Sequence, residues 1–380
     1  MIDRVVLITI DALRADQPWS GYTKAKTPNL SRFVEQSVFF ARTYATANTT
    51  GPSLSSLLAV RYPTELPRDD CPLAGFEMGD GLAPVLQRGG VWTAAAHGHA
   101  YFAGSSAPKD GFTAWRTVDN VAGRLATEGA VTGPEVTKLA INLVQEAPAD
   151  GKSFIWAHYL EPHDAYVRHK DFPATDEPRR GVYDGEVAFA DDQAGKLLAA
   201  IDASPAASRT AVIVASDHGE AFGEHERYRH GFTVFEEEVR VPLMVRVPGV
   251  PPHRIDAPRG TMDIPKTIAD LLSVQAPDRW RGNTLVQDLR SPSPPQRPVI
   301  VDVPRLMNLP AQQVVVLGDY KVVLQGTRWS VFNLRADPKE ARRLPKEQAE
   351  PFIEKAKAAL ARIETVPSGA CKSAPFRLKK

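Results

Sequence analysis

Short apolar runs alternate with segments of helical periodicity over the first 290 residues. The runs are rich in β-branched residues and cover 5–10, 91–96, 154–157, 211–215 and 241–247. Such runs are typical of strands buried on both faces of a parallel sheet. Between them, apolar residues recur every three or four positions, as over 136–144 and 187–201. The alternation predicts an α/β sandwich with a mostly parallel central sheet.

The pattern changes after residue 290. Residues 291–298 are rich in proline and serine, which predicts a linker. Strand-like runs follow, and Gly318-Asp319 indicates a hairpin turn between the two middle ones. The runs cover 299–303, 314–317, 321–324 and 329–334, and a helical segment spans about 346–363. We therefore expect a large domain over 1–290, the linker, and a C-terminal subdomain with a small antiparallel sheet over 299–380.

The composition is that of an ordinary globular protein. The 380 residues are 43% hydrophobic, enough for a large core, and Lys+Arg 46 against Asp+Glu 45 leave a formal net charge of +1. This balance gives no global field that favours nucleic acid as a partner. No apolar run reaches the ~18 residues of a membrane span, and Cys71 and Cys371 lie too far apart for a CxxC site. Whether these two cysteines pair stays open.

Acidic residues and a histidine follow two of the apolar runs. Asp11 comes after the first run, and Asp217 and His218 come after the run at 211–215. Ligands of open α/β sheets bind beyond the carboxyl ends of the strands, so we expect these side chains to lie at one edge. Two carboxylates and an imidazole suit zinc or manganese better than calcium or magnesium. Alternatively, each aspartate caps its own turn.

Thr50 lies where a run of hydroxyl residues meets an apolar-periodic stretch, "TTGPSLSSLL". We expect Pro52 to open a helix there, because proline is favoured at the first helical position. A hydroxyl at this point lies beside free backbone N–H groups, and next to a metal ion it can ionise and attack phosphorus or sulfur. The alternative is that Thr49 or Thr50 only caps the helix.

Five segments resemble, in order and spacing, the sulfatase family of the alkaline phosphatase superfamily. They are "ITIDALRAD", "TTGPSLSSLL", "HYLEPHDAY", "SDHGEAFGEH" and "HGFTVFEEEVRVPLMV". The tail, with "GDYKVV" and "FNLRADPKEARRL", resembles the C-terminal subdomain of that family. The resemblance implies an alkaline-phosphatase-like α/β/α sandwich, a divalent metal ion and an anionic ester substrate.

The chain departs from the formylglycine sulfatases at several motif positions. Thr50 stands where those enzymes have a modifiable Cys or Ser, Ala12 replaces a second aspartate, and His218 replaces an asparagine. The lysine of their G-K-W-H region is also missing from the matching stretch at 96–99. These departures resemble the threonine-nucleophile branch of phosphoethanolamine and glycerol-phosphate transferases and phosphodiesterases. For that branch, the resemblance implies metal ligation by Asp11, Thr50, Asp217 and His218.

The resemblance also assigns roles to histidines. It implies catalytic contacts to the phosphoryl group by His163 and His230, or their binding of a second ion together with Glu161. The candidates for substrate binding are Arg14, His97, His99 and His158. An ion pair of Arg14 with Asp16 is the alternative for that arginine, and His225 is a weaker candidate. Asp191 and Asp192 fit the exposed face of a helix.

We therefore expect a metal-dependent hydrolase of phosphate or sulfate esters that uses Thr50 as nucleophile and favours phosphoesters. A phospho-headgroup transferase acting on a lipid or glycan stays open, as does a non-catalytic binding protein on the same fold. Transferases of this kind usually carry membrane helices, and the absence of one here favours hydrolysis. Relatives are often soluble domains placed after membrane helices, which favours an extracytoplasmic location, with a cytoplasmic one open. The oligomeric state is not predicted.

Overall fold

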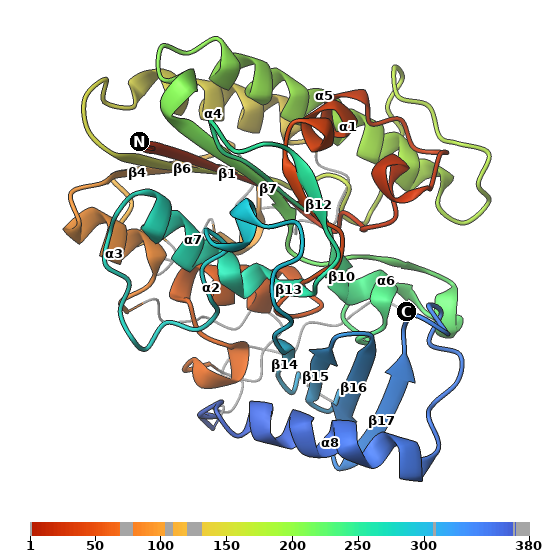
Figure 1. Cartoon of the computed structure of the whole chain (residues 1–380). Helices are drawn as coiled ribbons and strands as arrows, with labels where there is room; N and C mark the ends of the chain where they lie inside the picture. The colour runs from red at the N-terminus through yellow and green to blue at the C-terminus, as the bar shows by residue number, and fades with distance from the viewer. Residues whose placement is uncertain are drawn as a thin grey trace.

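A mostly parallel eight-stranded sheet forms the centre of the larger part of the molecule (Figure 1). The computed structural model describes residues 2–68, 79–102, 109–119, 131–306, 309–367 and 369. The strand order is β12-β2-β11-β7-β1-β6-β4-β5. The strands are β1 (Arg4–Ile10), β2 (Val38–Phe40), β4 (Trp92–His97), β5 (Ala114–Thr117), β6 (Ser153–Tyr159), β7 (Thr210–Ser216), β11 (Leu243–Arg246) and β12 (His253–Ile255). Only β11 runs against its neighbours, so the predicted mostly parallel sheet is confirmed.

Helices cover both faces of this sheet (Figure 1). Successive side chains of a strand point to opposite faces, so β1 contributes to two cores. Val6, Ile8 and Ile10 pack in the core under one helical layer, and Val5 and Leu7 pack in the core under the other. The first layer is α1 (Pro28–Glu35), α4 (Gly133–Glu146) and α5 (Gly181–Asp202), and the second is α2 (Thr50–Ala59), α3 (Leu82–Arg88) and α7 (Ile264–Leu271). The expected α/β/α sandwich is therefore confirmed.

The run at 241–247 is not the single strand that its composition predicts. It is divided into β10 (Arg240–Val241) and β11, with Pro242 between them. Proline has no N–H to donate to a ladder, so it ends the first pairing. The strand β10 pairs instead with β3 (Thr43–Tyr44), which also pairs with β13 (Arg259–Gly260) in a separate three-stranded sheet.

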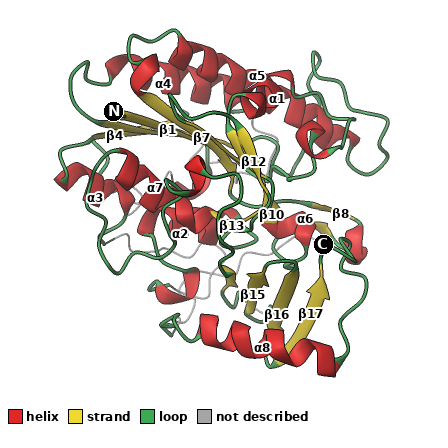
Figure 2. Cartoon of the chain, in the orientation of Figure 1, coloured by secondary structure: helices red, strands yellow, loops and turns green. Residues whose placement is uncertain are grey.

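The C-terminal part is a four-stranded antiparallel sheet covered by one helix (Figure 2). The strands are β14 (Val299–Val303), β15 (Gln312–Leu317), β16 (Tyr320–Gln325) and β17 (Arg328–Asn333), and the helix is α8 (Lys346–Leu360). Val315 and Val322 pack against Ile353 of α8, while Val314 faces the other way and packs with Tyr44 of β3. The predicted antiparallel sheet is confirmed, and the boundaries at 290 and 298 stay a prediction.

Asp191 is not on an exposed helix face, so that prediction is wrong. Its side chain is buried in α5, where Oδ1 accepts from the Leu30 N–H at 2.7 Å and Oδ2 accepts from the Asn29 N–H at 3.1 Å. The first N–H groups of a helix have no partner within it, and Asp191 supplies acceptors for two of those of α1. Asp192 is half-buried and pairs with Lys196.

Candidate active site

The carboxyl ends of three neighbouring strands meet at one edge of the central sheet. The register pairs Ile10 of β1 with Ser216 of β7 on one side and with Tyr159 of β6 on the other. Asp11 therefore emerges beside Asp217 and His218, and one ligand atom from each of these three residues lies within 4.8 Å of the others. No other group of three or more such residues that could hold a metal ion occurs among the described residues.

Thr50, at the start of α2 in the second helical layer, also lies at this cluster. The helix α2 begins at Thr50, two residues earlier than the position of Pro52 predicts. Thr50 is buried, and its Oγ1 lies 3.3 Å from Asp11 Oδ2 and 3.1 Å from His218 Nε2. Thr49 occupies the N-cap position without a side-chain capping bond. The Thr50 hydroxyl is therefore directed at the acidic cluster, at the positive end of the helix dipole.

The cluster has the features of a divalent cation site. Asp217 Oδ1 accepts from the N–H groups of Ala12 and His218, but its buried Oδ2 accepts no hydrogen bond from the described residues. Burial would lower the pKa of His218, yet Asp217 and Asp11 raise it to about 10, so the cluster favours an added positive charge. A bound cation supplies that charge, and two carboxylates with an imidazole are a suitable donor set.

The residue after Asp11 supplies no further carboxylate to the cluster. Ala12 is buried and adopts the left-handed conformation with φ of 56°. Its N–H donates to Asp217 Oδ1, and its carbonyl accepts from the Tyr183 hydroxyl at 2.9 Å. The methyl group at this position adds no ligand, and the backbone holds Asp11 in place.

Five histidines around the cluster share one feature: a partner outside the cluster contacts Nδ1 of each ring. The Nδ1 contacts are His99 with the Tyr101 N–H, His158 with Thr9 Oγ1, His163 with the Asp164 carbonyl, His218 with the Gly219 carbonyl and His230 with Glu220 Oε1. The hydrogen bond at one ring nitrogen sets the chemistry of the other. Nε2 is therefore the nitrogen that remains for the site: that of His218 contacts Thr50 and Asp11, and those of His99 and His158 have no hydrogen-bond partner among the described residues.

His99 and His158 form the buried floor beside Asp11. Their Nε2 atoms lie 3.5 Å and 3.6 Å from Asp11 Oδ2. His99 Nδ1 accepts a hydrogen bond from a backbone N–H, so in the neutral ring Nε2 carries the proton. Burial keeps the pKa of His99 well below its ordinary value, although Asp11 opposes this. His99 is therefore a hydrogen-bond donor toward the cluster and not a metal ligand.

His163 and His230 lie on the solvent side of the cluster. Both are half-buried, whereas Asp11, Thr50 and His218 are buried. The ring of His230 is 4.2 Å from that of His218 and 5.0 Å from that of His163. Loops that follow β6 and the hairpin of β8 (Ala221–Phe222) and β9 (Tyr228–Arg229) carry these two histidines.

The structure does not bring His97 to the cluster. Its Nδ1 accepts from the His99 N–H, and its Nε2 lies 3.1 Å from Thr117 Oγ1. The ring packs against Phe102 and Trp115, and burial lowers its pKa to about 3. Both ring nitrogens are used within the fold, so His97 is not available to bind substrate.

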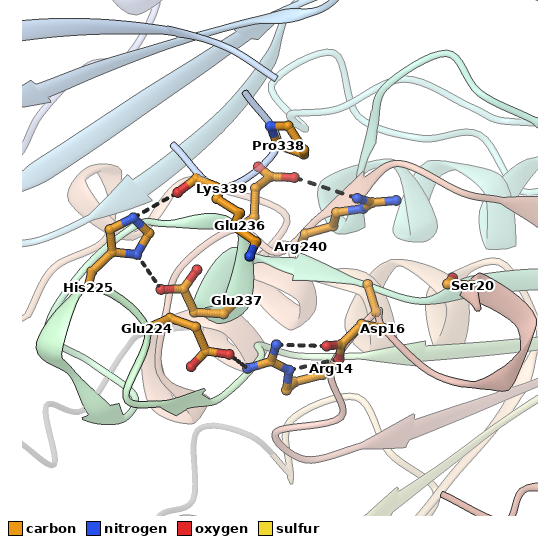
Figure 3. A pocket seen from close by; sticks show the side chains of 11 residues that line it. Arg14, Asp16, Ser20, Glu224, His225, Glu236, Glu237, Arg240, Pro338 and Lys339 are labelled. Atoms are coloured by element: carbon orange, nitrogen blue, oxygen red, sulfur yellow. Dashed lines mark hydrogen bonds and ion pairs between the residues drawn. The ribbon is translucent and has the colours of Figure 1, made fainter. Parts of the chain in front are cut away.

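Arg14 and His225 lie in the wall of a separate pocket of about 520 Å³ (Figure 3). Arg14 forms ion pairs with Asp16 and Glu224, and His225 forms one with Glu237. No cluster residue is among the described residues that line this pocket. The ion pair of Arg14 with Asp16 is therefore the alternative that the structure contains, and the guanidinium is not left to bind a substrate.

Glu161 is a helix cap and not an ion ligand beside His163. Its Oε1 accepts from the N–H groups of Thr132 and Gly133 at 2.5 Å and 3.0 Å, at the start of α4. Its Oε2 accepts from the Thr132 hydroxyl at 3.2 Å. Both oxygens accept hydrogen bonds within the fold, so they do not favour the alternative of a second ion bound by Glu161, His163 and His230.

Sequence reasoning missed Glu238, which fixes the loop that carries His230. This buried carboxylate accepts from the N–H groups of Gly231, Phe232 and Thr233. Burial raises its pKa to about 7, although hydrogen bonds from Thr233 oppose the shift. The side chain of Asn48 donates to the Thr233 carbonyl at 2.7 Å, which ties the same loop to the segment before Thr50.

Two further predictions concern the whole chain. Among the described residues, no helix has both the length and the apolar character needed to cross a bilayer. Cys71 and Cys371, whose pairing was left open, lie outside the described residues.

Comparison with known proteins finds relatives in sequence and in structure. An ulvan-active sulfatase of Formosa agariphila is 23% identical over 340 residues, which cover 76% of this chain and 65% of that protein. The chain thus spans less than two thirds of the length of that relative. The crystal structure of Ps i-CgsB in complex with a neocarrahexaose superposes with a TM-score of 0.80 at 18% identity, covering 97% of this chain and 95% of that one.

A phosphonate monoester hydrolase of Agrobacterium radiobacter has the same fold. It superposes with a TM-score of 0.72 at 18% identity and covers 94% of this chain and 95% of that one. The family model described as Sulfatase matches residues 3–274, which include every residue of the cluster at the sheet edge. The chain therefore belongs to the sulfatase family, as its motifs predict.

Proposed function

We propose that the protein is a metal-dependent hydrolase of phosphate or sulfate esters that uses Thr50 as a covalent nucleophile and favours phosphoesters. The observation that carries this proposal is the position of the Thr50 hydroxyl. It lies within hydrogen-bonding distance of Asp11 and His218, at a helix N-terminus, in a cluster that favours a cation. A nucleophile is activated by this combination of a neighbouring base, a helix dipole and a metal site.

Asp11, Asp217 and His218 would hold the ion, and we expect zinc or manganese, because an imidazole nitrogen replaces an oxygen ligand. When bound, such an ion lowers the pKa of a neighbouring hydroxyl and offsets negative charge on a non-bridging oxygen. The chain supplies the remaining interactions. His99 Nε2–H points toward Asp11 Oδ2, beside the attacking oxygen, and provides a hydrogen bond to the phosphoryl or sulfuryl group.

The reaction then takes place in two displacements. Thr50 Oγ1, which has released its proton to water, forms a bond to phosphorus or sulfur, and the bond to the ester oxygen breaks. The leaving oxygen takes a proton from the imidazolium of His163 or His230. In the second step water attacks the threonyl ester and returns a proton to the same imidazole. Phosphate or sulfate is released, and Thr50 Oγ1 leaves as the alkoxide that began the cycle. Transfer to an acceptor alcohol in place of water would make the protein a transferase.

The preference for phosphoesters follows from the side chain at position 50. Threonine carries one hydroxyl on its reactive carbon, so a threonyl ester is released only by a second attack at phosphorus or sulfur. The hydrate of formylglycine carries two hydroxyls on one carbon and can expel its ester group without such an attack. The fold shared with a phosphonate monoester hydrolase supports phosphorus as a substrate centre, and the ulvan-active sulfatase supports sulfur.

We predict that metal-replete protein turns over aryl phosphate monoesters, diesters or phosphonates faster than the matching aryl sulfate. The expected difference in kcat/KM is at least about tenfold, or ~1.4 kcal/mol of transition-state free energy. The measurement is a panel of 4-nitrophenyl esters, which keeps the leaving group constant. An aryl sulfate as the best substrate would show that the preference is reversed. Release of free phosphate or sulfate when no acceptor alcohol is added indicates hydrolysis, because a transferase needs that acceptor.

A further inference from the structure

We propose that Glu220 is a positioning residue that holds His230 with Nε2 toward the substrate and so makes His230, not His163, the general acid. The general-acid role of His230 rests on the proposed function. The structural part of the proposal, the tautomer and orientation of one imidazole, is independent of catalysis. Glu220 lies directly after the Asp217-His218-Gly219 segment, on the same short stretch of backbone as two cluster residues.

Both carboxylate oxygens of Glu220 have partners. Oε1 accepts from His230 Nδ1 at 3.0 Å, and Oε2 accepts from the Tyr166 hydroxyl at 2.8 Å. The side chain is fully buried, with 0% exposure, so water does not compete for these oxygens. A carboxylate held at both oxygens cannot rotate, and it offers Nδ1 only acceptors. His230 Nδ1 therefore carries a proton, and Nε2 is the nitrogen left for the substrate.

The backbone of Glu220 is fixed as firmly as its side chain. Its N–H donates to the Glu237 carbonyl at 2.8 Å, and its carbonyl accepts from Arg14 at 2.7 Å. Gly219 allows this close approach, since a Cβ there would lie 2.1 Å from the Glu237 oxygen. Through Glu220, the position of His230 therefore depends on the backbone that follows β7 and carries Asp217 and His218.

The two candidate acids differ in what holds them. His163 Nδ1 contacts the carbonyl of its own neighbour Asp164, a neutral and local partner. His230 Nδ1 contacts a buried anionic carboxylate, and charged hydrogen bonds are stronger and more directional than neutral ones. A carboxylate also stabilises positive charge on the imidazole while it holds the proton for the leaving oxygen. This favours His230 as the acid and leaves His163 to bind the substrate.

The kinetic test compares Glu220→Gln with wild type on phosphoesters of falling leaving-group ability, from 4-nitrophenol to an alkyl alcohol. A good leaving group needs little protonation, so we expect less than threefold loss of kcat with 4-nitrophenyl esters. The loss should exceed about tenfold with alkyl esters, with KM changed little. In a His230→Ala background, Glu220→Gln should cause no further loss, because the two residues act as a unit.

His163→Ala is the matched control, and its loss should not depend on the leaving group. A loss in Glu220→Gln that is equal across the series, or that adds fully in the His230→Ala background, would overturn the proposal. If Glu220→Gln does not fold, Tyr166→Phe is the second variant, because it removes the hydrogen bond to Oε2 and keeps the carboxylate. Its loss of kcat should depend on the leaving group in the same way but be smaller.

A second readout does not need activity. In protein labelled with nitrogen-15 in histidine, the His230 signals, assigned by their loss in His230→Ala, should show a protonated Nδ1 in wild type. Glu220→Gln should weaken this preference. A neutral His230 with the proton on Nε2 in wild type would contradict the proposal. If wild type hydrolyses no ester but the spectrum shows the expected tautomer, the proposed function fails and the assignment of Glu220 as the residue that orients His230 stands.

Discussion

Replacement of Thr50 by alanine is expected to lower kcat by at least roughly a thousandfold and to leave the fold intact, because the substitution removes the attacking atom. The stability cost should be small. Among the described residues, Thr50 Oγ1 contacts Asp11 and His218 alone and caps no N–H of α2. One lost buried hydroxyl interaction costs about 1 kcal/mol, which corresponds to a fall in Tm of no more than about 4 °C for a chain of this size.

Two neighbouring variants make this result specific. Thr49→Ala changes the preceding N-cap residue, which makes no side-chain capping bond, and should keep the rate within about twofold of wild type. Thr50→Ser keeps a hydroxyl and should retain part of the activity that alanine loses. A Thr50→Ala protein with a wild-type rate would remove Thr50 from the chemistry, whatever its position in the cluster.

The second large effect concerns the metal ion. We expect one tightly held zinc or manganese ion per chain, lost when His218 is replaced by alanine and kept when His230 is replaced. His218 Nε2 lies 3.2 Å from Asp11 Oδ1 and 3.8 Å from Asp217 Oδ2, so we expect it to be a direct ligand of the ion. His230 is fixed by Glu220 beside that set. Removing a direct ligand should weaken ion binding by more than about 100-fold, beyond the range typical of outer partners.

Metal analysis of protein dialysed without added metal is the measurement. Stoichiometric zinc or manganese in wild type and in His230→Ala, with none in His218→Ala, is the predicted pattern. Ala12 and His218 are the reason to expect a transition metal, since an oxygen ligand is missing and a nitrogen ligand is present. Stoichiometric calcium alone, or equal loss from both variants, would contradict the ligand assignment.

The sequence predicted best those features that depend on single strands. Asp11, Asp217 and His218 follow buried strands, and parallel strands end at one edge, so their meeting follows from chain order and register. Side chains that act across the fold were harder to place. Asp191 has the spacing of an exposed helix position, and only the packing of α1 against α5 buries it.

The histidines show the same limit at the level of single atoms. His97 ends β4 and His99 lies two residues later. The ring of His97 packs against Phe102 and Trp115, whereas His99 Nε2 lies 3.5 Å from Asp11 Oδ2. Which ring nitrogen faces the cluster depends on partners from distant segments, and no local pattern contains that information. Glu220 was missed for this reason, although it lies two residues after His218.

The central claim is that Thr50 becomes covalently modified during turnover, and trapping that species tests it most directly. An ester with a good leaving group makes the first step fast, so rapid acid quench should capture the threonyl ester, and phosphothreonine survives acid. Peptide mass spectrometry is then expected to find one phosphoryl group on Thr50, with Thr50→Ala unlabelled under the same quench. A burst of alcohol release with no phosphoryl group on Thr50, or with the group on another hydroxyl residue, would contradict the account.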